Sequence, residues 1–203
     1  SKARYVDQQD RTSLKRLLGQ QQNRSELQSI GTFSYKKVYD CLKGQSYLSI
    51  LTISIEKFKK VSFEHGYEQY DKVVDVFEQA LVDSWGGEGG FRRKDAVLRD
   101  PNNKNIYYIL LSSPRARNKA INPIDLEGVA DRVTDKLISK LLNLSFDKSH
   151  RPISDLLVTI STKFVIGYGS ILNNPSFTET DLVNKVIELS QQTLALQLQR
   201  NMQ

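Results

Sequence analysis

A predicted β-hairpin in the middle of the chain constrains the fold more than any other feature. Ala96–Leu98 is a short apolar run, residues 100–105 are rich in turn formers, and Ile106–Leu111 is β-branched and aromatic. This pattern predicts a strand, a tight turn and a second strand.

The residues just before the hairpin have two interpretations. Arg92 and Asp95 place a cation and an anion three positions apart. An arginine fork can grip a phosphate or a guanine edge through two parallel hydrogen bonds, and an aspartate can accept from a guanine amino or imino group. A solvated surface ion pair gives the same spacing and contributes little to stability. The pair alone does not separate ligand binding from a surface contact.

The segments around the hairpin predict helices packed on a sheet. Tyr47–Ile55 is β-branched and apolar enough for a central strand. Gly66 is expected to end a helix with a positive φ, and Thr178 with Asp181 resembles a capping box at a helix start. Helices are predicted over 34–42, 58–65, 68–85, 125–142 and 181–199, and further strands over Leu156–Ile160 and Phe164–Gly169. The order predicts an α+β fold with a central, mostly antiparallel sheet flanked by helices.

Length and composition indicate one domain with an appendage. The 203 residues are 39% hydrophobic and 26% charged, which is typical of a globular protein. Residues 1–28 are polar and rich in Gln with a thin leucine stripe, and we expect a helical lead-in or connector there; a frayed terminus is the alternative. Residues 29–203 are expected to form the domain. No segment is apolar for long enough to span a bilayer.

Charge, cysteine and histidine content limit the kinds of ligand, disulfide and metal site that the chain can have. The net charge of +6 favours an anionic ligand, but no zinc spacing, Gly-rich phosphate loop or nucleic-acid motif accompanies the basic residues, so duplex nucleic acid is not expected. Cys41 is the single cysteine, which excludes an internal disulfide and fits a cytoplasmic protein. His65 and His150 stand without Cys or carboxylate partners at ligand spacing, and we expect no metal at them.

Several short matches point to one family. They are Phe58 with Lys59, Gly66, Asp71, the set Arg92, Asp95 and Arg99, Arg132 within Gly128–Val133, Ile166 with Gly167, and Arg200 with Asn201. In this order they resemble a GGDEF domain, the fold of diguanylate cyclases, over nearly all of residues 30–203. The resemblance implies a ferredoxin-like palm of the nucleotidyl-cyclase type.

The departures from this family fall on its catalytic residues. Ser54 stands at the position of the first metal-binding aspartate and Ser62 at that of the guanine-reading asparagine, which leaves Asp71 alone of that pair. The signature turn is replaced by residues 103–107, including Asn103, Lys104 and Asn105. Cyclisation needs magnesium to neutralise triphosphate charge, and glycines let the backbone approach phosphates. The resemblance therefore implies a degenerate domain that is not an enzyme and holds no metal or cofactor.

The matches fall instead on the family's inhibitory site. In that site Arg-x-x-Asp, together with the arginine of a neighbouring helix from the same or a partner domain, binds cyclic di-GMP. The resemblance places Arg92, Asp95 and Arg132 there, with Arg93 adding positive potential. It implies a cyclic di-GMP receptor in bacterial second-messenger signalling, working through a homodimer or a protein partner.

Two other functions stay open from the sequence. One is an interaction scaffold that keeps the fold and has no ligand. The other is a GTP-binding regulatory domain with residual activity, in which Asp71 and the nearby lysines hold a purine triphosphate. Titration with cyclic di-GMP beside GTP separates the three.

Overall fold

The computed structural model describes residues 29–86, 92, 94–111 and 123–202. The predicted lead-in over residues 1–28 lies outside these ranges, and so does Arg93. Among the described residues, no helix is both long and apolar enough to cross a membrane.

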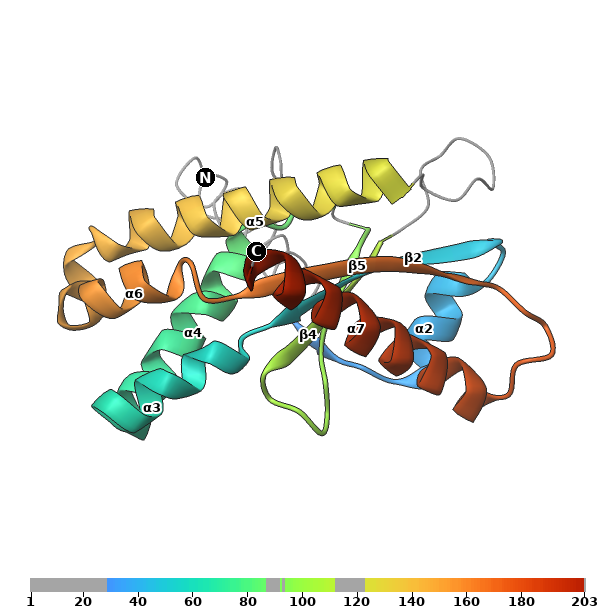
Figure 1. Cartoon of the computed structure of the whole chain (residues 1–203), viewed down its shortest axis with the longest axis horizontal. Coiled ribbons are helices and arrows are strands. Elements are labelled where there is room, and N and C mark those ends of the chain that lie inside the picture. Colours follow the sequence, from blue (N-terminus) through green and yellow to red (C-terminus); the bar gives the residue numbers. More distant parts are fainter. Residues whose placement is uncertain (1–28, 87–91, 93, 112–122, 203) are drawn as a thin grey trace, which may run out of the picture.

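A five-stranded mixed sheet forms the centre of the domain (Figure 1). Its strands are β1 (Gly31–Thr32), β2 (Tyr47–Ser54), β3 (Ala96–Arg99), β4 (Ile106–Leu111) and β5 (Val165–Leu172), in the spatial order β1-β3-β4-β2-β5. The short β1 pairs with β3 in parallel, and the other pairs are antiparallel. The predicted hairpin is the pair of β3 and β4, and the predicted central strand is β2. The α+β fold class is confirmed.

Helices cover both faces of this sheet. They are α2 (Tyr35–Leu42), α3 (Lys59–His65), α4 (Tyr67–Asp83), α5 (Pro123–Ser145), α6 (Ser154–Ile160) and α7 (Glu179–Met202), with 3-10 turns at Glu56–Phe58 and Lys148–Ile153. Side chains alternate across β2, so Leu51 and Ile53 join the core beneath α4 and α5, whereas Leu48 and Ile50 join the core beneath α2 and α7. Each face of the central strand is therefore buried.

The prediction of a strand over Leu156–Ile160 is wrong, because these residues lie in α6. A short apolar run cannot be assigned to strand or helix by composition alone. Leu157 and Ile160, three positions apart, are both buried, as on one face of a helix. Asp155 lies in the first turn, where a carboxylate favours the positive end of the helix dipole.

Two local predictions are confirmed. Gly66 follows α3 with a φ of 88° and begins α4, so this glycine makes the sharp change of direction between the two helices. At the start of α7, the Asp181 carboxylate accepts from the Thr178 backbone N–H at 3.0 Å, and Thr178 Oγ1 accepts from the Asp181 N–H at 3.2 Å. This reciprocal pair is a capping box.

Candidate functional site

The turn that precedes β3 is built around the backbone of Arg92. The Arg92 carbonyl accepts from the indole Nε1 of Trp85 at 2.9 Å and from the backbone N–H of Asp95 at 3.0 Å. The Arg92 N–H donates to Asp95 Oδ2 at 2.6 Å. Both backbone groups of Arg92 are thus fixed by neighbours, while its side chain is exposed. The turn presents one guanidinium from a held backbone.

Asp95 faces inward from this turn. Only 3% of the residue is exposed, and its carboxylate is an acceptor for the turn itself. Such a hydrogen bond to an ionised group is stronger than one between neutral groups. Burial is the main cause that raises the pKa of the Cys41 thiol in α2, and the negative charges of Asp40 and Asp95 raise it further. Asp95 therefore stabilises the turn through this hydrogen bond. Its role as a guanine acceptor stays a prediction.

Arg132 lies on the exposed side of α5. Its guanidinium passes Gly128, since a Cβ at Gly128 would be 3.6 Å from Arg132 Nη1. Arg132 makes no hydrogen bond or ion pair with any residue that the structure describes. The assembly of Arg132 and Arg92 into one site stays a prediction. Arg99 is engaged by Glu78, whose carboxylate accepts from Arg99 Nε at 2.7 Å.

The turn that follows β3 closes the hairpin and is held by Asp100. The Asp100 carboxylate accepts from the backbone N–H groups of Asn102 and Asn103 at 2.8 and 2.9 Å, and from the hydroxyl of Tyr108 at 2.6 Å. Asn103 Oδ1 in turn accepts from the Asn105 N–H at 3.0 Å. These bonds fix a compact turn at the position where the family resemblance places the catalytic signature.

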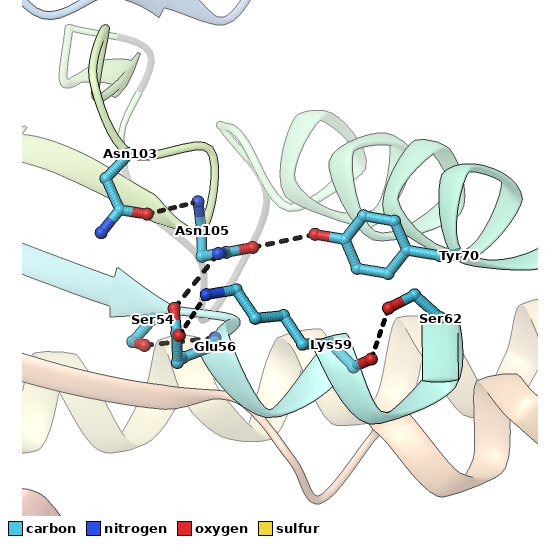
Figure 2. Close-up of polar contacts among 7 residues, drawn as sticks. All are labelled: Ser54, Glu56, Lys59, Ser62, Tyr70, Asn103 and Asn105. Atoms are coloured by element: carbon cyan, nitrogen blue, oxygen red, sulfur yellow. Dashed lines mark hydrogen bonds and ion pairs between the residues drawn. The ribbon is translucent and has the colours of Figure 1, made fainter. Parts of the chain in front are cut away.

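Asn105 reaches from this turn into a polar network beneath it (Figure 2). It is only 6% exposed. Its Nδ2 donates to Glu56 Oε2 at 3.1 Å, and its Oδ1 accepts from the Tyr70 hydroxyl at 2.8 Å. Glu56 Oε1 is also paired with Lys59 Nζ at 2.5 Å. The network therefore ties the hairpin turn to the 3-10 turn after β2 and to α3 and α4.

The pKa shifts agree with this network. The hydrogen bond to Glu56 is the main cause that raises the pKa of the Lys59 ammonium. Burial is the main cause that raises the pKa of the Tyr70 hydroxyl. Lys59 is therefore held in its charged form and Tyr70 in its neutral form, in which the hydroxyl donates to Asn105.

The remaining predicted positions of the lost catalytic site are scattered around this network. Ser54 ends β2, and its Oγ accepts from the Glu56 N–H at 3.3 Å. Ser62 Oγ donates to the Lys59 carbonyl at 2.6 Å within α3 (Figure 2). Asp71 and Lys104 are exposed. The structure thus brings Ser54 and Asn105 together around Glu56, while Ser62 makes only a local helix contact.

No group of three or more His, Cys, Asp or Glu side chains that could hold a metal occurs in the described part of the chain. Glu56 is the carboxylate nearest to Ser54 along the chain, and both its oxygens are already engaged by Asn105 and Lys59. His65 Nε2 lies 3.9 Å from Glu64 Oε2, its neighbour in the chain. The expectation of no metal stays a prediction.

Sequence reasoning missed the contacts that Glu56, Lys59, Tyr70 and Trp85 make around these two turns. Glu56 and Tyr70 meet Asn105 across 49 and 35 residues of sequence, so no local pattern joins them. One usable signal was present. Glu56 lies two positions after Ser54, where the family resemblance places a metal-binding aspartate, so a carboxylate near the turn could have been noticed.

Comparisons with known proteins place the fold. No protein-family model matches the chain, and no curated protein matches it either. Among solved structures, the chain is similar to the S helix-GGDEF-EAL region of Vibrio cholerae LapD bound to c-di-GMP, with a TM-score of 0.53 and 13% identity, over 93% of this chain and 38% of that one. It is also similar to the diguanylate cyclase SiaD of Pseudomonas aeruginosa in complex with its activator SiaC, with a TM-score of 0.52 and 13% identity, over 98% of this chain and 70% of that one.

The chain has the fold of a GGDEF domain. It spans well under half of the LapD region that it matches. At this level of identity the likeness establishes the architecture and leaves activity and ligands to be argued from the two turns.

Proposed function

We propose that this GGDEF-fold domain is a receptor for cyclic di-GMP and does not synthesise it. The observation that carries the proposal is the contrast between the two turns. The turn before β3 fixes the backbone of Arg92 and leaves its guanidinium exposed, whereas Asn105 of the turn after β3 is engaged by Glu56 and Tyr70.

Arg92 suits this ligand chemically. Cyclic di-GMP carries two phosphates and two guanines, and a guanidinium binds either group through paired hydrogen bonds. A pre-fixed backbone lowers the entropy that binding must remove. Arg132 and Arg93 add positive charge in the proposed site, and the net charge of +6 favours an anionic ligand.

Asp95 is proposed to act mainly through Arg92. Its Oδ2 already accepts the Arg92 N–H, and the residue is almost fully buried. A carboxylate oxygen can accept more than one hydrogen bond. Because Asp95 is buried, a guanine N–H has little access to its carboxylate. We therefore assign the direct ligand contact to the arginines and the fixing of the turn to Asp95.

The loss of catalysis is proposed from the side chains around Asn105. Cyclisation of GTP needs carboxylates that hold Mg²⁺. Ser54 supplies a hydroxyl at one such position, and both oxygens of Glu56 are occupied within the domain. Incubation with GTP and magnesium or manganese is expected to yield no cyclic product, and reproducible turnover would contradict this part of the proposal.

Titration calorimetry tests the binding part. The parent chain is expected to bind cyclic di-GMP, and Arg92→Ala to weaken binding about ten- to a hundredfold, because a charge-assisted contact contributes about 1.5–3 kcal/mol. Lys104→Ala, an exposed cation in the other turn, is the matched control and should leave the affinity unchanged. Binding of GTP but not of cyclic di-GMP would favour the GTP-binding alternative, and binding of neither would favour a scaffold.

A further inference from the structure

A groove of about 540 Å³ lies between α3 and α6, at the end of the domain away from α2 (Figure 1). Its apolar lining comes from Val61 and Phe63 of α3 and from Leu156 and Ile160 of α6. The volume is within the usual range for ligand-binding clefts. Neither Arg92 nor Arg132 lines it, so the groove is separate from the proposed dinucleotide site.

Phe63 gives the groove an exposed aromatic edge. The residue is 85% exposed although it is one of the largest apolar side chains of the domain. Val61, two positions earlier, is only 5% exposed and belongs to the core. An exposed aromatic residue beside an apolar cleft is typical of a protein-interaction site, where it anchors the partner.

The charged lining of the groove is unbalanced. Lys57 and Lys163 line it and form no ion pair with any residue in the described ranges. The two acidic lining residues are both engaged: Glu56 with Lys59 and Asn105, and Glu64 with Lys60 at 3.6 Å. Two ammonium groups therefore remain for a partner of opposite charge.

The shape of the groove selects the kind of partner. Its two walls, α3 and α6, are helices of seven residues each, about 10 Å long at 1.5 Å per residue. A channel between two short helices accommodates about two turns of a third helix, whose apolar face then lies against the apolar lining residues. The free lysines favour acidic residues beside that face.

We propose that the groove binds an acidic amphipathic helix of a partner protein. Phe63 and the other apolar lining residues would contact the apolar stripe of the helix, and Lys57 and Lys163 would pair with its carboxylates. This inference concerns a surface other than the cyclic di-GMP site and does not depend on dinucleotide binding.

Fluorescence anisotropy with synthetic peptides tests the proposal on the full chain. Three labelled helical peptides of about 14 residues, roughly four turns, serve as probes. The first has a Leu and Phe stripe flanked by Glu, the second has the same stripe flanked by Lys, and the third keeps the Glu residues but replaces the stripe by Gln. The first peptide is expected to bind at least about tenfold more tightly than the others, with an affinity that falls as salt is raised.

Variants locate the binding. Phe63→Ser is expected to weaken the first peptide about tenfold, and its high exposure means that the fold should tolerate the change. Lys57→Glu combined with Lys163→Glu should reverse the preference toward the Lys-flanked peptide. Tyr39→Ser and Lys36→Glu on α2 are the matched controls at the other end of the sheet, with Tyr39 47% exposed, and should change nothing (Figure 1).

Three results would overturn the proposal. One is equal binding of all three peptides, and a second is binding of the acidic peptide that the groove variants do not alter. The third is self-association of the chain in sedimentation velocity that Phe63→Ser abolishes, because the groove would then be an interface between copies. Circular dichroism of each variant confirms that an observed loss reflects the groove and not unfolding.

Discussion

The two turns on either side of β3 are both polar, yet their buried side chains have different partners. In the turn before β3, the carboxylate of Asp95 is buried against the backbone and the guanidinium of Arg92 is exposed. In the turn after β3, Asn105 is buried against Glu56 and Tyr70, and Lys104 is exposed. The first turn holds a backbone so that it presents a cation. The second joins three segments of the domain.

This difference shows how a structural role of a polar residue can be told from a ligand-binding role. A buried polar group must find a hydrogen-bond partner, and losing that partner costs more than the bond contributes on average. Asn105 has its partners within the domain, so its chemistry is already used. The side chain of Arg92 reaches solvent while its backbone is fixed, which is the arrangement that a ligand can use.

The largest expected effect comes from the two aspartates that hold the turns. Asp95→Ala and Asp100→Ala each remove a carboxylate that accepts backbone hydrogen bonds, and each should lower the free energy of unfolding by about 1–3 kcal/mol. Only Asp95→Ala should also weaken cyclic di-GMP, by about tenfold or more, because it frees the Arg92 backbone. Urea denaturation and calorimetry measure the two effects, and equal loss of binding in both variants would remove the distinction between the turns.

The sequence predicted the long strands and helices, but it missed the two-residue strand β1 and placed a strand where α6 lies. Long apolar or β-branched runs such as Tyr47–Ile55 and Ile106–Leu111 strongly favour strands, and turn formers mark where the hairpin reverses. Leu156–Ile160 was assigned to a strand because a short apolar run has no decisive period. In the fold it forms α6, which packs against α5 and buries Leu157 and Ile160.

The site was less predictable than the fold. Arg92 and Asp95 could be found because they are three positions apart. Their spacing does not show that Asp95 is buried, nor that Trp85, just after α4, donates to the Arg92 carbonyl. The partners of Asn105 are far away in sequence and are chosen by tertiary packing. Spacing identifies candidate residues, and only the fold shows which of them are exposed and which are buried.

A smaller effect is expected from Asn105→Ala. The substitution leaves the half-buried Tyr70 hydroxyl and one Glu56 oxygen without their partner, and should lower the free energy of unfolding by about 1–2 kcal/mol. Asn102→Ala, an exposed position in the same turn, should change it by less than about 0.5 kcal/mol. Cyclic di-GMP affinity should be the same in both variants. A loss of affinity in Asn105→Ala alone would mean that the second turn takes part in binding.

The smallest effect at neutral pH, and a measurable one in alkali, is expected from the hairpin tyrosines. Burial is the main cause that raises the pKa of both Tyr107 and Tyr108 well above 10. Below pH 10 both states keep these protons, so stability is unchanged. Above pH 10 the unfolded chain releases them first, and stability should fall by up to about 1.4 kcal/mol per pH unit for each group.

Denaturant melts at a series of pH values measure this slope. Tyr107→Phe should make it shallower by removing one of the tyrosines whose pKa is raised. A parent chain whose stability stays flat through pH 11 would contradict the burial of these hydroxyls, and with it the closed hairpin on which the comparison rests.

The most direct test of the central claim uses Trp85, the single tryptophan of the chain. Its indole N–H donates to the Arg92 carbonyl at 2.9 Å, so its NMR signal reports on the proposed site. Addition of cyclic di-GMP is expected to shift this signal to saturation, in parallel with the calorimetric binding curve, and the shift should be lost in Arg92→Ala. If cyclic di-GMP binds by calorimetry while the indole signal does not move, the ligand binds elsewhere and the account is contradicted.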